Sequence, residues 1–109
     1  MTENEAKAAL IARQAELAEE DRISGDARAP VTLQQDSVGR LSRMDAMQQQ
    51  AMAQAQERRR GQERVRIKAA LARIEEGEWG YCGRCGEGIA PARLSHDPSA
   101  ALCVGCAAG

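Results

Sequence analysis

The chain has 109 residues, 28% of them charged, and a formal net charge of −1. This length leaves room for about one domain, and the near-neutral charge argues against a protein whose affinity comes mainly from neutralising nucleic-acid phosphates. Because alanine supplies much of the apolar fraction and the chain has no Phe, one Trp and one Tyr, a large hydrophobic core is not expected.

The N-terminal sequence lacks the features of a secretory signal. Residues 1–7 show no basic start followed by an apolar segment, and no stretch reaches the ~20 apolar residues that span a membrane. We therefore expect a cytoplasmic protein that has no membrane contact. In a reducing cytosol, four regularly spaced cysteines are more often a metal site than a pair of disulfides.

Composition divides the chain into two parts. Helix-forming residues dominate 1–76, whereas Gly, Pro and Cys concentrate in 77–109. We expect a mainly α fold in which an antiparallel helical hairpin, a coiled coil, precedes a small four-cysteine zinc-finger module. The hairpin is predicted to have helices at about 2–24 and 37–76, joined by a connection at about 25–36.

The first predicted helix is amphipathic. It contains no Pro or Gly, and it places Ala6, Leu10 and Leu17 at nearly regular four- or seven-residue spacing among acidic residues. Gly25 is expected to end this helix in the left-handed conformation. Pro30 disfavours helix at the residue before it, so a connection is expected there.

The second predicted helix would be more than about 50 Å long at ~1.5 Å per residue, and a helix of that length needs a partner. The first helix is expected to supply it in antiparallel coiled-coil packing. The interlocking side chains are predicted to be Leu41, Met44, Met47, Ala51, Met52 and Ala55 against Ala6, Leu10, Leu17 and Ile23. The last turns are predicted to pack on Trp79, Ile89 and Leu94 through Val65, Ile67, Leu71 and Ile74.

A basic run lies on the second helix, made of Arg58, Arg59, Arg60, Arg64, Arg66, Lys68 and Arg73. One interpretation is a solvated helix face with Glu57 and Glu63 as local partners. A second is a positive patch that docks on an acidic partner surface, for which the candidate residues are Arg58, Arg59, Arg60 and Arg66. A third is that the run neutralises the acidic start of the first helix.

The cysteine spacing is the strongest signal in the chain. Cys82-x2-Cys85 is followed, after 17 residues, by Cys103-x2-Cys106, which is typical of zinc sites. Two residues between cysteines allow a tight turn to aim both sulfurs at one metal, and four thiolates leave no position for water or substrate. We therefore predict one structural Zn²⁺ and no enzymatic activity.

The sequence allows other interpretations of the cysteines, of His96 and of the two aromatic residues in the C-terminal module. A thioredoxin-like Cys82 and Cys85 pair needs a βαβ context and leaves the second pair unexplained, whereas a redox switch that releases zinc needs accessible thiolates of low pKa. His96 is expected at the surface, with replacement of a cysteine ligand as the alternative. Trp79 and Tyr81 are expected to cap the small core, with a nucleic-acid stacking platform as the alternative.

The C-terminal module also resembles a known family. The run Gly80-Tyr81-Cys82-Gly83-Arg84-Cys85-Gly86, followed by Ile89, Arg93-Leu94, Pro98 and Leu102-Cys103-Val104-Gly105-Cys106, resembles the DksA/TraR family of bacterial zinc-finger proteins. This resemblance covers about residues 62–107, and the family also has a helical hairpin before its finger. It implies a regulator that inserts its coiled coil into the secondary channel of RNA polymerase and recognises no DNA sequence. We expect a monomer.

The resemblance further implies that acidic residues at the hairpin tip act on the polymerase. In one register Asp36 matches the first acid of the family's Asp-x-x-Asp-x-Ala motif, and Gly39 stands at the second acid. A second register, counted back from the cysteines, preserves neither acid. Asp36 and Asp45 are therefore the candidate tip residues, and the alternative for Asp36 is a cap of the second helix.

Two further expectations concern other ligands. Family members that respond to the alarmone ppGpp use basic residues around the finger and on the second helix; Arg66 is a candidate for one of them. Asp97 and Ala107 stand at two other such positions, so the resemblance does not predict a ppGpp response. The alternative function is a nucleic-acid-binding zinc protein that uses the basic face of the second helix and binds less tightly as salt rises.

Overall fold

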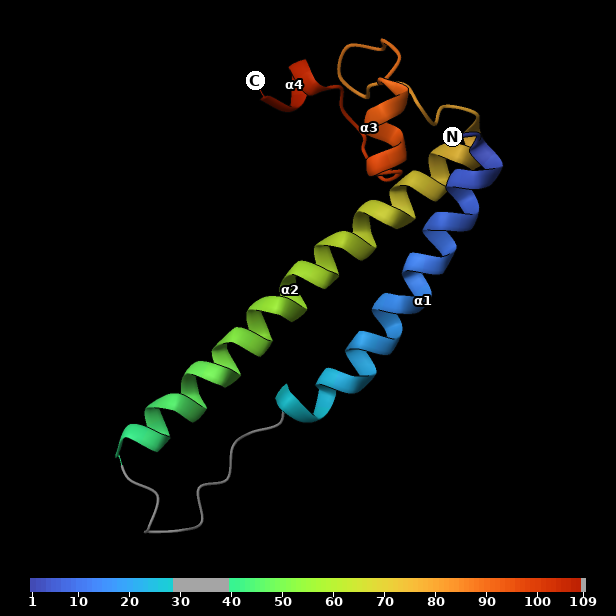
Figure 1. Cartoon of the computed structure of the whole chain (residues 1–109). Helices are drawn as coiled ribbons and strands as arrows, with labels where there is room; N and C mark the ends of the chain where they lie inside the picture. The colour runs from blue at the N-terminus through green and yellow to red at the C-terminus, as the bar shows by residue number, and fades with distance from the viewer. Residues whose placement is uncertain (29–39, 109) are drawn as a thin grey trace.

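A computed structural model describes residues 1–28 and 40–108. Within them the chain forms helices α1 (Glu3–Arg28), α2 (Arg40–Glu76), α3 (Pro91–His96) and α4 (Val104–Ala108). Figure 1 shows α1 and α2 side by side as a hairpin, with the C-terminal module at the end where α1 begins. The described residues form no strand beyond an isolated antiparallel bridge between Tyr81 and Gly88, so the predicted mainly α fold is confirmed.

The molecule is elongated. Its principal extents are 61 × 29 × 19 Å and its radius of gyration is 19.2 Å, compared with roughly 13 Å for a compact domain of this length. A chain this extended buries few side chains, and no described helix is long and apolar enough to cross a membrane. The fold therefore depends on short stretches of close packing, supplemented by ion pairs.

Helix α1 begins with a capping box that the sequence analysis overlooked. Thr2 Oγ1 accepts a hydrogen bond from the Glu5 N–H at 3.1 Å, and Glu5 Oε1 accepts one from the Thr2 N–H at 2.9 Å. These bonds also hold the pKa of Glu5 below its usual value. At the other end, α1 continues through Gly25 to Arg28, because glycine weakens a helix without forbidding it.

Helix α2 ends in a Schellman motif. Gly77 has a φ of 75°, its N–H donates to the Ile74 carbonyl at 3.1 Å, and the Glu78 N–H donates to the Arg73 carbonyl at 2.8 Å. This pair of bonds is the pattern by which a left-handed glycine satisfies the last carbonyls of a helix. It turns the chain from the hairpin into the C-terminal module.

Among the side chains that the structure describes, the two helices bury apolar groups against each other in the half of the hairpin next to the C-terminal module. Leu10 and Leu17 of α1 form one buried cluster with Ile67 and Ala70 of α2, and Leu71 lies partly buried against them. Leu17 and Ile67 are the largest fully buried side chains among the described residues. This cluster is the apolar contact that joins the two helices.

The predicted set of interlocking side chains is wrong for four residues of the second helix and for Ile23, whereas Ala55 is half-buried. Ile67 and Leu71 pack against α1 instead of against the module, Val65 is exposed, and the side chain of Leu41 lies outside the described part. The other predicted apolar contacts are also exposed: Ile23, Met44, Met47, Ala51 and Met52. Apolar residues recur at many positions of α2, so their spacing alone is compatible with several registers of the two helices.

Ion pairs between the helices accompany this register. Arg13 donates from Nε and Nη2 to the two carboxylate oxygens of Glu63, at 2.7 and 3.0 Å. This bidentate bond lowers the pKa of Glu63 and raises that of Arg13. Lys7 Nζ lies 3.2 Å from Glu75 Oε1 nearer the module. Residues later in α1 thus pair with residues earlier in α2, and the hairpin is therefore antiparallel.

Asp21 pairs with two cations of the basic run. Its Oδ1 accepts from Arg60 Nε at 2.8 Å, and its Oδ2 accepts from Arg64. Arg60 also donates from Nη2 to Ser24 Oγ at 2.7 Å. These two arginines therefore neutralise an acidic residue near the end of α1, whereas the third interpretation of the run expected the acidic start of that helix.

Replacing a buried and an exposed side chain of α2 tests this register. Ile67→Ala removes a side chain that is 1% exposed and should lower the free energy of unfolding by about 2–5 kcal/mol. Val65→Ala, two residues away and 69% exposed, should change it by less than about 0.5 kcal/mol. Urea denaturation followed by circular dichroism measures both, and equal losses would contradict the register.

Candidate metal centre

The C-terminal module, residues 77–108, encloses a small apolar cluster at the base of the hairpin. Trp79, Cys82, Ile89 and Leu94 are buried together, and Ala6 of α1 is fully buried against them. Trp79 is in this core as predicted, and its Nε1 donates to the Pro98 carbonyl at 2.9 Å. Ala6, predicted to contact the second helix, joins α1 to this module, in a cluster against which Ile74 of α2 also packs.

Tyr81 departs from its predicted place in the core. Its side chain is 57% exposed, while its backbone forms the bridge to Gly88. In an extended segment two residues that are two positions apart point to the same side, but Gly80, with a φ of 95°, turns the chain between Trp79 and Tyr81, so that Trp79 is buried and Tyr81 is exposed. Of the two aromatic residues, Trp79 therefore covers the small core and Tyr81 does not.

The first cysteine pair lies in a tight hairpin turn. The Cys82 N–H donates to the Glu87 carbonyl at 2.7 Å, and the Gly86 N–H donates to the Cys82 carbonyl at 2.9 Å. Cys82 Sγ accepts hydrogen bonds from the N–H groups of Arg84 and Cys85, at 3.4 and 3.5 Å. Gly86 has a φ of 79°, a conformation that favours glycine. This turn aims both thiols to the same side.

The second cysteine pair lies at the start of α4. The Cys106 N–H donates to Cys103 Sγ at 3.5 Å, and the Ala107 N–H donates to the Cys103 carbonyl at 2.9 Å. Arg84 links the two turns, since its Nη1 donates to the Cys106 carbonyl at 3.3 Å. Both pairs therefore present their sulfurs to one point.

The four sulfurs have the spacing that a zinc ion requires. All four Sγ atoms lie within 4.8 Å of one another, and the Sγ atoms of Cys85 and Cys103 are 3.8 Å apart. Four sulfurs at ~2.3 Å from a central zinc form a tetrahedron with edges of roughly 3.8 Å. The cysteines are thus positioned to bind one metal ion, and they are the only group of three or more candidate ligands among the described residues.

The ionisation of the thiols also favours a bound cation. Backbone N–H groups, chiefly that of Cys85 and then that of Cys103, lower the pKa of Cys82 to about 5. Neighbouring thiols, Cys103 first, raise the pKa of Cys106 to about 12. Because thiolates this close repel one another, all four can ionise together only around a positive ion, and Zn²⁺ supplies that charge.

The module is attached to the hairpin by contacts that the cysteine spacing did not predict. Arg73 of α2 donates from Nη2 to the carbonyls of Ser99 and Ala100, at 3.5 and 3.4 Å. Asp97 Oδ1 accepts from the Ser99 N–H at 3.1 Å and from its Oγ–H at 2.6 Å. Asp97 therefore stabilises the turn on which Arg73 docks.

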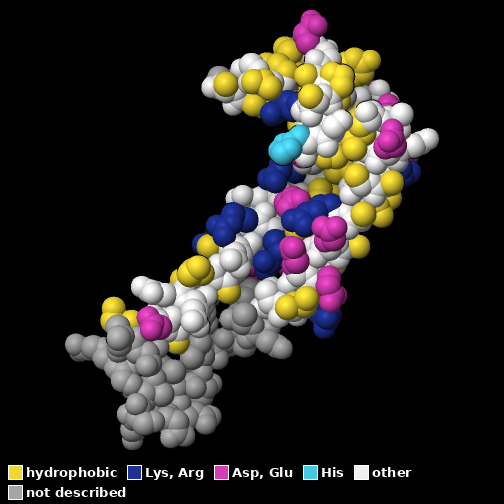
Figure 2. Space-filling view, viewed as in Figure 1, with side chains coloured by type: hydrophobic (Ala, Val, Ile, Leu, Met, Phe, Trp, Pro, Cys, Tyr) yellow, Lys and Arg dark blue, Asp and Glu magenta, His cyan; other side chains and the backbone are white. Residues whose placement is uncertain are grey.

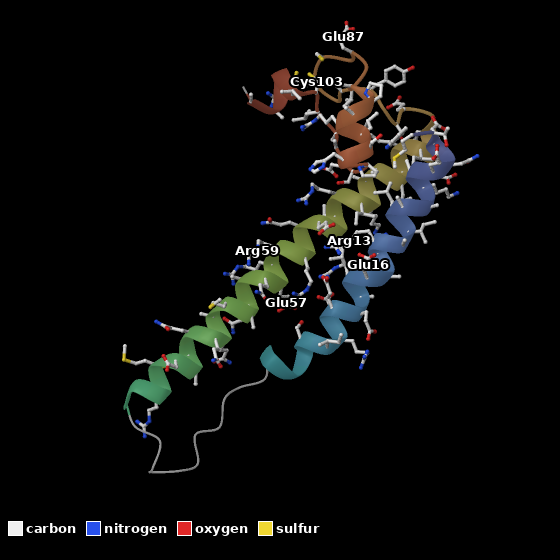
Figure 3. The ribbon with its side chains drawn as sticks, viewed as in Figure 1. Arg13, Glu16, Glu57, Arg59, Glu87 and Cys103 are labelled. Carbon is white, nitrogen blue, oxygen red and sulfur yellow. The ribbon has the colours of Figure 1, made fainter. Side chains whose placement is uncertain are left out.

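The remaining predicted site residues lie away from the sulfurs. Figure 3 shows Cys103 and Glu87 in the C-terminal module and Arg59 on the middle of α2. Arg58, Arg59 and Arg66 are exposed, and His96 is exposed without entering the thiol cluster. Asp45 is exposed near the start of α2, whereas Asp36 lies outside the described residues.

Comparisons with known proteins agree with this geometry. Residues 77–109 match the family of the prokaryotic dksA/traR C4-type zinc finger. A 41-residue segment is 42% identical to the RNA polymerase-binding transcription factor DksA of Haemophilus influenzae. That match covers 38% of this chain and 28% of the relative, so it is confined to part of either protein.

A solved structure extends the likeness to the hairpin. The structure of transcription factor DksA2 from Pseudomonas aeruginosa superposes with a TM-score of 0.73 over 97% of this chain and 80% of that one. The sequences are 22% identical, so the match establishes a common fold. Together, the four clustered thiols and the matched family identify a C4 zinc finger.

Removing zinc should unfold the finger while much of the hairpin stays helical. Zinc binding to such a site contributes on the order of 10 kcal/mol, more than this small apolar cluster supplies. Trp79, the single Trp of the chain, lies in that cluster, so chelation should shift its fluorescence to longer wavelength. A protein that keeps its Trp79 emission after zinc is shown to be absent would contradict this dependence.

Replacing one ligand should reduce bound zinc, whereas replacing the histidine should not. Cys103→Ser removes a sulfur from the cluster and should lower the zinc content well below one ion per chain, as measured by elemental analysis. His96→Ala is the matched control, because His96 lies outside the cluster. Equal zinc loss in both variants would contradict this assignment and would indicate that His96 is a zinc ligand.

Proposed function

We propose that this protein, which carries the zinc finger of the DksA/TraR family at the base of a DksA-like hairpin, is a transcription regulator that binds RNA polymerase directly. The observation that carries the proposal is a combination of two matches. The finger matches the C4 family model, and the fold of nearly the whole chain, hairpin included, matches that of DksA2. The name of the Haemophilus influenzae relative supplies the partner. The protein would act in the cytoplasm, where the polymerase works, without catalysing a reaction.

The hairpin is suited to enter a channel. Figure 1 shows α2 running on past the end of α1, away from the finger, and the whole molecule is narrow compared with its length. We therefore propose that the hairpin inserts into the secondary channel of the polymerase and modulates initiation. The finger would stay at the channel mouth as a structural scaffold, since four thiolates leave zinc no open position for chemistry.

One acidic candidate, Asp45, lies near the start of α2, at the end of the hairpin that would be inserted. Asp45 is exposed and takes part in no ion pair within the described part of the chain. An unpaired carboxylate carried to the inner end of a channel can act on cations or metal-bound groups there. Asp36 belongs to the same proposal on sequence grounds alone.

The exposed part of the basic run is the second proposed contact. Arg60 and Arg64 are occupied by Asp21, whereas Arg58, Arg59 and Arg66 are exposed and form no ion pair among the described residues. These three cations would dock on an acidic outer surface of the polymerase. With Lys68, they are also what favours the second candidate function, nucleic-acid binding, because phosphates attract the same charges.

Binding to purified core polymerase tests the proposal. The wild-type protein should bind with a Kd in or below the micromolar range and should alter initiation in a reconstituted transcription assay. Asp36→Asn combined with Asp45→Asn should abolish the effect on initiation, because the acidic side chains are lost without a change of shape. Glu87→Gln, an exposed acid on the finger, is the control and should leave it intact.

A charge reversal separates the two candidate functions. Replacing Arg58, Arg59 and Arg66 by Glu should weaken polymerase binding about tenfold or more, since docked cations meet repulsion. The finger and the buried cluster at Ile67 are untouched, so zinc content and helicity should persist. If the wild-type protein binds nucleic acid more tightly than polymerase, and the reversal abolishes that binding, the nucleic-acid function replaces the proposed one.

A further inference from the structure

The two cysteine pairs are supported differently. The first lies in a turn that the backbone itself closes, because the Cys82 N–H donates to the Glu87 carbonyl and the Gly86 N–H donates to the Cys82 carbonyl. The second lies at the start of α4, which has five residues and contains no buried side chain. A helix this short is not stable by itself. The backbone of the second pair therefore depends on contacts from elsewhere in the chain.

Both arginines of the C-terminal module supply such contacts. Arg93 of α3 donates from Nε to the Leu102 carbonyl at 3.0 Å, and Leu102 directly precedes Cys103. Arg84 of the first turn donates from Nη1 to the carbonyl of Cys106 at 3.3 Å. The two guanidinium groups thus bond the backbone next to one metal-binding cysteine and at the other.

Arg73 supports the segment that leads into the second pair. From the last turn of α2, its Nη2 donates to the carbonyls of Ser99 and Ala100, at 3.5 and 3.4 Å. Every carbonyl of residues 98–102 accepts a hydrogen bond from a residue outside this segment. The donors are, in the order of the carbonyls, Trp79, Arg73 for two of them, Gly83 and Arg93. The path of the chain into Cys103 is therefore fixed by contacts with α2, α3 and the first cysteine turn.

The charge of a zinc-loaded site favours the same three arginines. Four thiolates carry more negative charge than one Zn²⁺ neutralises, and the module has three acidic residues against two arginines. Arg73, Arg84 and Arg93 take part in no ion pair within the described part of the chain, so no carboxylate there offsets their charge. Hydrogen bonds from a charged donor are stronger than those from a neutral one. Each arginine therefore positions the backbone and also adds positive charge beside the metal centre.

We propose that Arg73, Arg84 and Arg93 are positioning residues that retain the zinc ion by holding the backbone of the second cysteine pair. The proposal concerns the isolated protein and does not rest on the proposed function. Arg84 joins the two cysteine turns, and the metal joins the same two turns, so both stabilise one arrangement. Coupling of this kind is reciprocal, so the loss of an arginine contact weakens zinc binding. Arg93 has the shortest bond of the three and a half-buried side chain, so it contributes most.

Transfer of zinc to a coloured chelator measures its retention in the full chain. Arg93→Gln removes the guanidinium and should weaken zinc affinity about tenfold or more, the usual effect of losing an outer-shell partner of a metal. Arg84→Gln and Arg73→Gln remove longer bonds and should each weaken it about threefold to tenfold. Arg58→Gln removes the same charge from an exposed position of α2 well before the module. This control should change zinc affinity less than about twofold.

Co²⁺ bound in place of zinc reports, through its sulfur-to-metal absorption, whether all four sulfurs remain ligands. Arg84→Gln and Arg73→Gln should keep the wild-type absorption and helicity while they lose zinc faster, which a finger that fails to fold would not do. If Arg93→Gln loses the absorption, these two variants decide the question.

Three results overturn the proposal. The first is zinc loss at the wild-type rate in both Arg84→Gln and Arg73→Gln. The second is equally faster loss in Arg58→Gln, because overall charge would then explain the effect. The third is loss of the Co²⁺ absorption in all three variants of the module contacts, because the arginines would then be needed for folding and not for positioning.

Discussion

The convergence of four sulfurs on one point is the constraint on which the structure depends. The two cysteine turns hold the ends of the 17-residue segment between Cys85 and Cys103 close together, and Cys82 lies in the same cluster as Trp79 and Leu94. Ala6 from α1 and Ile74 from α2 contact this cluster. The metal centre thereby organises the module and also the point where α1 begins and α2 ends.

The hairpin changes character along its length. Beside the finger its helices meet through Leu10, Leu17 and Ile67. Farther away they meet through charges, in the groups Arg13 with Glu63 and Asp21 with Arg60. Figure 2 shows acidic and basic side chains gathered over the middle of the hairpin. Partly exposed ion pairs of this kind add little stability.

Sequence reasoning predicted the zinc site better than the hairpin. The C-x2-C spacing leaves little freedom, because each pair must meet a tetrahedral ion, and its four members lie together as expected. The helical hairpin follows from composition, but its register does not, since Ala and Met recur at many positions of α2. In the observed register Arg13 pairs with Glu63, 50 residues further along the chain. Local periodicity cannot predict such a pairing. The capping box at Thr2 and Glu5 was readable and was overlooked.

The central claim is that the hairpin, and not the finger alone, contacts RNA polymerase. Hydrogen–deuterium exchange of the zinc-loaded protein, with and without core polymerase, measures this most directly. The account predicts slower exchange in the complex over residues 43–55 of α2, the segment farthest from the metal. Protection confined to residues 77–108, with unchanged exchange in α2, would contradict it.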